Sequence, residues 1–347
     1  MGILRSLRGR RRGVPGEHLP RVPAGQPHEI GLLAPTGEPG VSERVPQPMR
    51  RHGADLVRLW VGSINYNDDI PFSEEIFSRL GDTYRRIRNT LRILLGNLYD
   101  FESGNHENRK GLTLIDRWIL ERLDEVIRNC RAAYENFEFH KVYHTLNQFC
   151  AVDLSSLYID ITKDRMYCDA PHSPRRRATQ TVMHEIFDAL CRLLAPVLAF
   201  TAEEAWRYSV PPDRDSVHLQ EFPEPRGRGH EATGQVDELL RLRGVIGQGI
   251  ERARQDKLIG NTLEARVVLN SDSDVTEKVS QEELEEFFIV CDLTIHQAKE
   301  ASASVTKTQY QKCARCWRHR PTVGTSKAHP DLCDRCESVV DKMTKSE

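Results

Sequence analysis

Long apolar runs are absent from this 347-residue sequence, and none approaches the roughly 18–20 residues that a membrane-spanning helix requires. The N-terminus is rich in arginine, but no apolar segment of a secretory signal follows it. A large net charge is also absent, because 49 Lys and Arg residues face 51 Asp and Glu residues. The chain as a whole is therefore not a basic nucleic-acid binder, and any such surface has to be local. No membrane partner is expected.

The sequence has too few cysteines, nine in all and unevenly placed, for a secreted disulfide framework. Five of them stand singly in apolar or helical surroundings and are predicted to be reduced thiols in the core. This usage favours a reducing, cytoplasmic setting. The five single cysteines are Cys130, Cys150, Cys168, Cys191 and Cys291.

Residues 1–50 contain eight Arg, eight Pro and eight Gly but no Lys, and they show no helical or strand period. We interpret them as a disordered segment. Two alternatives stay open, namely a basic arm for RNA and a stretch that is not a native reading frame. The composition changes abruptly just before Arg51, where patterned sequence begins.

Residues 73–209 carry apolar side chains at spacings of three and four, which predicts helices with one buried face. Short connections between such helices favour antiparallel packing. The expected fold class is therefore mainly α, with an antiparallel helical bundle followed by a small α+β unit and a zinc ribbon. Helices are expected over 73–99, from Asp116, over 139–158, from Pro174 after the capping residue Ser173, and at a capping box over 201–204.

The rest of the chain divides by composition. Residues 210–235 are rich in Pro, Gly, Arg and Glu and are expected to form a linker. Residues 236–300 combine a helical period with two short strand-like runs, at Leu263–Leu269 and Leu293–Ile295, and predict the small α+β unit. Residues 301–347 form the tail.

The tail contains the motif C-x2-C-x16-C-x2-C, formed by Cys313, Cys316, Cys333 and Cys336. Two such turns can bring four sulfurs to one tetrahedral Zn²⁺, and this spacing is a strong zinc signal. Because protein would fill all four positions, the zinc is expected to be structural rather than catalytic. Redox pairs or free thiols are disfavoured, because nothing nearby resembles a thioredoxin-like βαβ unit.

Candidate RNA-contacting residues occur in two places. On the first cysteine turn, Trp317 offers a stacking surface beside cations, a combination that suits single-stranded RNA. Packing of Trp317 against the ribbon is the alternative. The expected helices present arginines that could follow RNA phosphates or could simply be solvated. The cations in question are Arg315, Arg318 and Arg320 on the ribbon, and Arg85, Arg86, Arg88, Arg175, Arg176 and Arg177 on the bundle.

The bundle and the zinc tail together resemble the C-terminal part of bacterial isoleucyl-tRNA synthetase, a class I aminoacyl-tRNA synthetase. The resemblance covers roughly residues 51–340 and is specific as a set, although the four-cysteine motif is the one element that would suffice alone. Beside that motif, the stretches that carry it are Gly53–Val61, Asn65–Asp69, Tyr84–Arg92, Leu95–Phe101, Ala133–His140, Val152–Ser155, Asp160–Arg165, Leu194–Glu204 and Lys257–Gly260.

The resemblance implies a division of labour. In the family, a Rossmann catalytic domain uses ATP and Mg²⁺ to charge tRNA(Ile) with isoleucine, and an inserted domain edits mischarged valine. The helical bundle and the zinc-bearing tail bind tRNA and its anticodon. Residues 51–72 then correspond to the end of the catalytic portion, and 73–209 to the anticodon-binding bundle. The expected partner is tRNA(Ile), the expected state is a monomer, and no DNA partner is expected.

The sequence departs from the family at its beginning. No HIGH motif is present, since His28–Gly31 is the nearest string, and no KMSKS loop precedes Gly53. Lys342–Ser346 looks like that loop, but it follows the zinc motif with no nucleotide fold to present it, and we interpret it as coincidence. No catalytic residue is assigned. Our hypothesis is that the chain is a truncated product, whose first fifty residues are out of frame or mis-assembled. Such a product would not activate isoleucine alone.

Two other functions remain open at this point. One is a non-enzymatic tRNA-binding factor that acts in trans. The other is a DNA-repair glycosylase, since such enzymes carry a similar ribbon, but those enzymes use an N-terminal Pro-Glu, whereas this chain begins Met1-Gly2. Valyl- and leucyl-tRNA synthetases share the bundle type, and the four-cysteine tail favours the isoleucine member.

Overall fold

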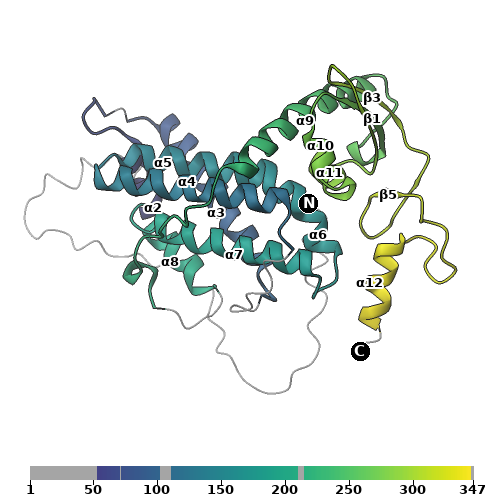
Figure 1. The fold of residues 1–347 in the computed structure, drawn as a ribbon. Coiled ribbons are helices and arrows are strands. Elements are labelled where there is room, and N and C mark those ends of the chain that lie inside the picture. Colours follow the sequence, from purple (N-terminus) through teal and green to yellow (C-terminus); the bar gives the residue numbers. More distant parts are fainter. Residues whose placement is uncertain (1–52, 71, 102–110, 210–214, 345–347) are drawn as a thin grey trace, which may run out of the picture. The chain divides into compact units, whose positions relative to one another are not determined.

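The structure is a computed structural model, and it describes residues 53–70, 72–101, 111–209 and 215–344 (Figure 1). The expectations for residues 1–50, including His28–Gly31, lie outside the described residues. So does the end of the Lys342–Ser346 string, from residue 345 onward.

Helices dominate the first part of the described chain, as the fold class predicted. Helix α4 packs against α5 and α7, while α3 packs against α7 and α8, which gives the expected bundle (Figure 1). Helix α9 (Glu231–Gln255), which lies outside the expected bundle, also packs against α4. The bounds are α2 Ala54–Ser63, α3 Glu74–Asn97, α4 Leu114–Glu135, α5 Phe139–Gln148, the π-helical segment η3 Phe149–Tyr158, α6 Ile159–Cys168, α7 Pro174–Leu194 and α8 Ala199–Arg207.

The apolar period of the sequence faces the bundle core. Along α3, Leu80, Ile87, Leu91 and Leu94 are all buried, in the order that the spacing of three and four predicts. Ser73 lies at the start of the helix, and its hydroxyl accepts a hydrogen bond from the backbone N–H of Ile76. Burial of this stripe supplies most of the stabilisation of the helix, because isolated helices are marginal in water.

The third predicted helix is longer than expected. It was expected to end near Tyr158, but helical structure continues without a break to Cys168, through the π-helical segment η3. Within that segment the hydroxyls of Ser155 and Ser156 donate to the carbonyls of Cys150 and Ala151, five residues earlier. Figure 1 shows α5 and α6 toward opposite ends of the bundle.

Carboxylates from distant parts of the chain cap several helix N-termini. Asp55 of α2 is buried and accepts hydrogen bonds from the backbone N–H groups of Phe200 and Thr201 at the start of α8. The predicted capping box at 201–204 is therefore wrong, because α8 begins at Ala199 and Thr201 lies inside it. Glu121 of α4 caps the next long helix in the same way, through the N–H groups of Ala232 and Thr233.

The segment after α8 lies against the bundle, although its composition indicated a linker. Arg228 donates to Asp124 of α4 at 2.8 Å and forms an ion pair with Glu185 of α7. The ring of Phe222 stacks on Tyr134 with the centroids 4.9 Å apart. A short 3-10 turn, η4 Val217–Leu219, lies in the same segment.

A small α+β unit follows. Its sheet has the order β2-β1-β3, with β1 parallel to β2 and antiparallel to β3. Strands β1 and β2 confirm the two strand-like runs, whereas β3 was not expected and lies in the part of the chain assigned to the tail. The bounds are α9 Glu231–Gln255, the 3-10 turn η5 Thr262–Glu264, β1 Ala265–Ser271, α10 Val275–Lys278, α11 Gln281–Phe288, β2 Asp292–Gln297 and β3 Ser302–Lys307.

Helix α9 covers the sheet at a glycine. A Cβ at Gly249 would lie 2.9 Å from Cγ2 of Val305 on β3, so a larger residue would push the helix off the strand. Beyond β3 comes the ribbon, which consists of β4 Gln311–Lys312, β5 His319–Arg320 and α12 Asp334–Thr344, with β4 and β5 antiparallel.

Across the described ranges, every helix is too short or too polar to cross a lipid bilayer.

Candidate metal centre and nucleic-acid interface

Two turns of the ribbon bring four cysteines together. Cys313 and Cys316 lie between β4 and β5, and Cys333 and Cys336 lie at the start of α12. Their sulfurs all lie within 4.8 Å of one another, and those of Cys316 and Cys333 are 3.9 Å apart. A tetrahedral site with Zn–S bonds of about 2.3 Å needs sulfurs roughly 3.8 Å apart. Among the described residues, these four cysteines are the one group of three or more His, Cys, Asp or Glu side chains that is placed to hold a metal ion.

Hydrogen-bond donors lie beside these sulfurs. The backbone N–H of Cys333 donates to Sγ of Cys313 at 3.4 Å, and Nη1 of Arg315 lies 3.7 Å from Sγ of Cys336. Hydrogen bonds with Cys316 and with each other lower the pKa of Cys333 and raise that of Cys336. Thiolates are the form that binds zinc, so the residues fit the metal.

The five single cysteines are core thiols, as predicted. All five are buried and free of disulfide bonds. Burial raises the pKa of Cys130, Cys150 and Cys168 to about 12 and that of Cys291 to about 11. These thiols stay protonated at neutral pH and act as core side chains.

The three ribbon arginines that were predicted to contact RNA all have partners within the protein. Arg318 is 5% exposed and donates to the carbonyl of Val290 at 2.6 Å. Arg320 pairs with Glu285 of α11 at 2.8 Å, and Arg315 donates to the carbonyl of Cys168 at the end of α6. These cations hold the ribbon to the rest of the chain, and their direct contact with RNA stays a prediction.

The Arg175–Arg177 run of the bundle is also engaged. Arg176 is 4% exposed, and its guanidinium meets both carboxylate oxygens of Asp100 at 2.8 and 2.9 Å. Arg177 donates to the backbone carbonyl of Asp100, and Arg175 pairs with Asp169 at 3.0 Å. Each of these arginines thus has a carboxylate or carbonyl partner that is distant in sequence or separated by a turn, and direct RNA contact by the run stays a prediction.

The remaining bundle candidates are exposed. Arg85, Arg86 and Arg88 lie on the outer face of α3, where Arg79 and Arg92 are exposed as well. Arg88 has a carboxylate of α8 at 3.3 Å, and Arg85 pairs with Asp82. Exposed pairs of this kind contribute only about 0–1 kcal/mol, so a phosphate can replace the carboxylate at little cost.

Trp317 presents its ring to solvent. This residue is 53% exposed. Its φ is 64°, in the left-handed region that non-glycine residues rarely adopt. The ammonium of Lys312 lies 5.2 Å from the centre of the ring. The structure therefore holds an indole outward beside a cation, and packing against the ribbon does not account for its position.

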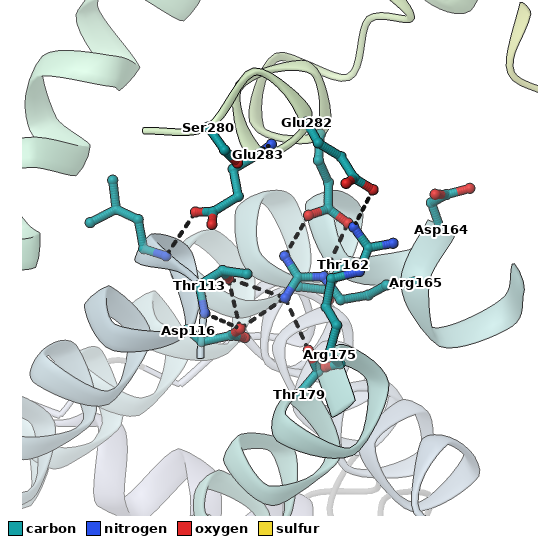
Figure 2. A network of polar contacts seen from close by, with 12 residues as sticks. Thr113, Asp116, Thr162, Asp164, Arg165, Arg175, Thr179, Ser280, Glu282 and Glu283 are labelled. Carbon is teal, nitrogen blue, oxygen red and sulfur yellow. Dashed lines mark hydrogen bonds and ion pairs between the residues drawn. The ribbon is translucent and has the colours of Figure 1, made fainter. Parts of the chain in front are cut away.

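Sequence reasoning missed a buried ionic network where α6 meets α4, α7 and α11 (Figure 2). Arg165 is fully buried and reaches Asp116 of α4 at 2.8 Å, Glu286 of α11 at 3.0 Å and Thr179 of α7 at 3.1 Å. Burial alone would lower the pKa of Arg165, but the two carboxylates raise it. The signal in the sequence was a charged residue inside the apolar stripe of a helix.

The comparisons with known proteins agree with this architecture. Residues 116–269 match the family described as the anticodon-binding domain of tRNA ligase. Residues 311–339 match the zinc finger found in FPG and IleRS. The fold and the cysteine site therefore define an anticodon-binding domain of the tRNA-ligase class that carries a zinc finger, and they support a structural zinc.

The similar proteins are isoleucine–tRNA ligases. An isoleucine–tRNA ligase from Symbiobacterium thermophilum is 42% identical over 316 residues, which are 84% of this chain and 34% of that protein. Those from Methylacidiphilum infernorum (42% over 322 residues, 91% and 34%) and Moorella thermoacetica (41% over 316 residues, 85% and 34%) are similar. Over most of its length the chain is thus a homologue of the isoleucine–tRNA ligases, and it corresponds to their C-terminal part.

These matches confirm the predicted resemblance and the predicted fold class. They also disfavour the DNA-repair glycosylase, because the zinc-finger family includes FPG proteins but the bundle family and the relatives are tRNA ligases. The chain spans about a third of the length of the relatives that it matches.

Proposed function

We propose that this chain is a tRNA-binding region of an isoleucine–tRNA ligase, with tRNA(Ile) as its partner. The observation that carries the proposal is the presence, in one chain and in this order, of an anticodon-binding bundle and a four-cysteine ribbon. ATP, Mg²⁺ and the charging reaction belong to the whole enzyme. The chain itself contributes RNA binding, and no catalytic residue is assigned to it.

The metal site is the first part of the proposal. Cys313, Cys316, Cys333 and Cys336 would hold one structural Zn²⁺, which would fix the turn that carries Trp317. Three further features support this, namely the mutual distances of the sulfurs, the N–H donors that point at them, and the small size of the ribbon core. Metal analysis of the purified chain should give one zinc per molecule.

The second part concerns the RNA contacts. Arg85, Arg86 and Arg88 would meet phosphates along α3, and Trp317 with Lys312 would stack on an unpaired base. The docked cations of the ribbon and of the Arg175–Arg177 run would act indirectly, because they hold these surfaces in place. Their own partners are the carboxylates and carbonyls given above.

The third part concerns organisation. We propose the bundle over 73–209, the α+β unit up to β3, and the ribbon after Lys307 as separate structural units, joined to residues 51–72 that would follow the catalytic portion. A monomeric state and a cytoplasmic location complete the proposal.

The test is a filter-binding titration of the 347-residue chain with tRNA(Ile) and with a non-cognate tRNA at two salt concentrations. Tighter binding of tRNA(Ile), which weakens steeply with salt, is expected. Equal binding of both tRNAs would remove the isoleucine assignment, and no binding would remove RNA recognition altogether. ATP–pyrophosphate exchange with isoleucine should be absent.

A further inference from the structure

One carboxylate on the bundle contacts cations from both turns of the ribbon. Both oxygens of Asp164, on α6, accept hydrogen bonds from Arg335 at 2.6 and 2.9 Å. Nη1 of Arg318 lies 3.7 Å from the same carboxylate. Arg318 belongs to the first cysteine turn of the ribbon and Arg335 to the second, so the two turns converge on one residue that lies outside the ribbon.

The end of α6 completes the contact. Arg315, which lies between Cys313 and Cys316, donates to the backbone carbonyl of Cys168, the last residue of α6. The side chain of Asp164 is 16% exposed, so its ion pairs are only weakly screened by water. Three cations of the ribbon, each within two residues of a cysteine, thus gather at one end of a bundle helix.

Helix α6 is itself held firmly. Arg165, the next residue, is anchored in the buried network with Asp116 and Glu286, and in Figure 2 Asp164 stands apart from that cluster. Asp164 therefore has a position that does not depend on the ribbon.

We propose that Asp164 couples zinc binding in the ribbon to docking of the ribbon on the bundle. A metal that closes both cysteine turns holds Arg318 and Arg335 at the separation that a single carboxylate can engage. In return, a carboxylate that engages both cations favours the arrangement in which the four sulfurs share one ion. Such coupling is reciprocal, so Asp164 raises zinc affinity although it is not a ligand. It is a positioning residue that acts through Arg335.

The inference rests on the proposed zinc ligation, and the experiment separates the two. Zinc affinity of the full chain is measured by competition with a chromophoric chelator, for the wild type and for Asp164→Asn. About tenfold weaker zinc binding is expected for Asp164→Asn, in the range typical of residues that support metal ligands without touching the metal. Absence of zinc in the wild-type chain would overturn the ligation itself. Wild-type zinc affinity in Asp164→Asn would overturn only the coupling.

A matched control lies one turn earlier on the same helix. Asp160 pairs with Lys163 at 2.5 Å and lies 3.8 Å from Arg243, and neither of these residues belongs to the ribbon. Asp160→Asn removes the same charge from α6 and should leave zinc affinity unchanged. An equal loss in both variants would show a general charge effect and would overturn the proposal.

A readout of docking completes the test. Trp118 and Trp206 are buried, whereas Trp60 is only half-buried, so acrylamide quenching reports on Trp317 when it is measured in a Trp60→Phe background. Resistance of the ribbon to a protease reports on its mobility. Asp164→Asn should make the ribbon easier to cleave while the helical signal of the bundle stays intact. Arg335→Gln should lose zinc to a similar extent, and the double variant should lose no more than either single variant. Additive losses, or a collapse of helicity in Asp164→Asn, would contradict the coupling.

Discussion

The bundle and the ribbon differ in how much apolar surface each can bury. The bundle core is continuous and includes side chains from every helix between α2 and α8. The ribbon buries three aliphatic side chains, Val323, Leu332 and Val339, around the cysteine cluster. A core of that size does not offset the entropy lost by ordering some forty residues, whereas a structural zinc contributes about 10–16 kcal/mol in zinc-finger peptides. The comparison teaches that one part of the chain is held by packing and the other by a metal.

The largest difference between the ribbon and the bundle is expected when the metal is removed. Cys316→Ser or Cys333→Ser should release zinc and unfold the ribbon, because three ligands and a small core cannot hold it. The bundle should keep its far-UV circular dichroism signal, since its core contains none of the four cysteines. A chelator added to the wild-type chain is the matching treatment. Loss of helicity across the whole chain would contradict this modular picture.

The second largest effect concerns the buried network that joins the bundle to the α+β unit. Arg165→Met should destabilise the chain by about 3–5 kcal/mol, because it leaves Asp116 and Glu286 as buried carboxylates with no cation. Urea unfolding followed by circular dichroism measures the change. Arg165→Lys is the control, and it should recover part of the loss because it restores the charge without the planar fork. A change below 1 kcal/mol in Arg165→Met would show that the network is dispensable.

The sequence predicted what depends on local pattern. The helices of the bundle follow from apolar spacing, and the metal centre follows from the spacing of four cysteines. The roles of the arginines did not follow, because a charged residue shows its partner only in three dimensions. Arg176 meets Asp100 and Arg318 meets Val290, 76 and 28 residues away.

Three other features were not predicted from the sequence, for related reasons. Strand β3 alternates exposed and half-buried side chains and has a single strongly apolar member, Val305, so the strand signal was weak. The N-terminus of α8 is capped by Asp55 from another helix, which no local capping pattern reveals. The outward position of Trp317 depends on a left-handed backbone within the metal turn.

A third test concerns the capping of the N-terminus of α8 by Asp55. Asp55→Ala removes the carboxylate that accepts from Phe200, Thr201 and the Thr201 hydroxyl, and it should cost about 1–2 kcal/mol, as loss of a helix cap does. Asp55→Asn keeps an acceptor oxygen and should recover part of that loss. Thermal unfolding of the bundle measures both variants, and equal stabilities of Asp55→Ala and the wild type would contradict the capping role.

The smallest effect is one of pH, and it tests whether ion pairs matter in a region held mainly by packing. Burial raises the pKa of Asp100, but hydrogen bonds and charges from Arg176, Gln180 and Arg177 outweigh burial and hold it below the ordinary value of 3.8. A carboxyl whose pKa is lower in the folded state contributes stability above its unfolded pKa and loses it as pH falls through the folded value. The bundle of Asp100→Asn should therefore be slightly less stable than the wild type at pH 7. The difference should shrink as the pH is lowered past 3.8. Urea midpoints measured by circular dichroism at several pH values report this difference, and an offset that stays constant across the acid range would show that Asp100 acts through its shape rather than its charge.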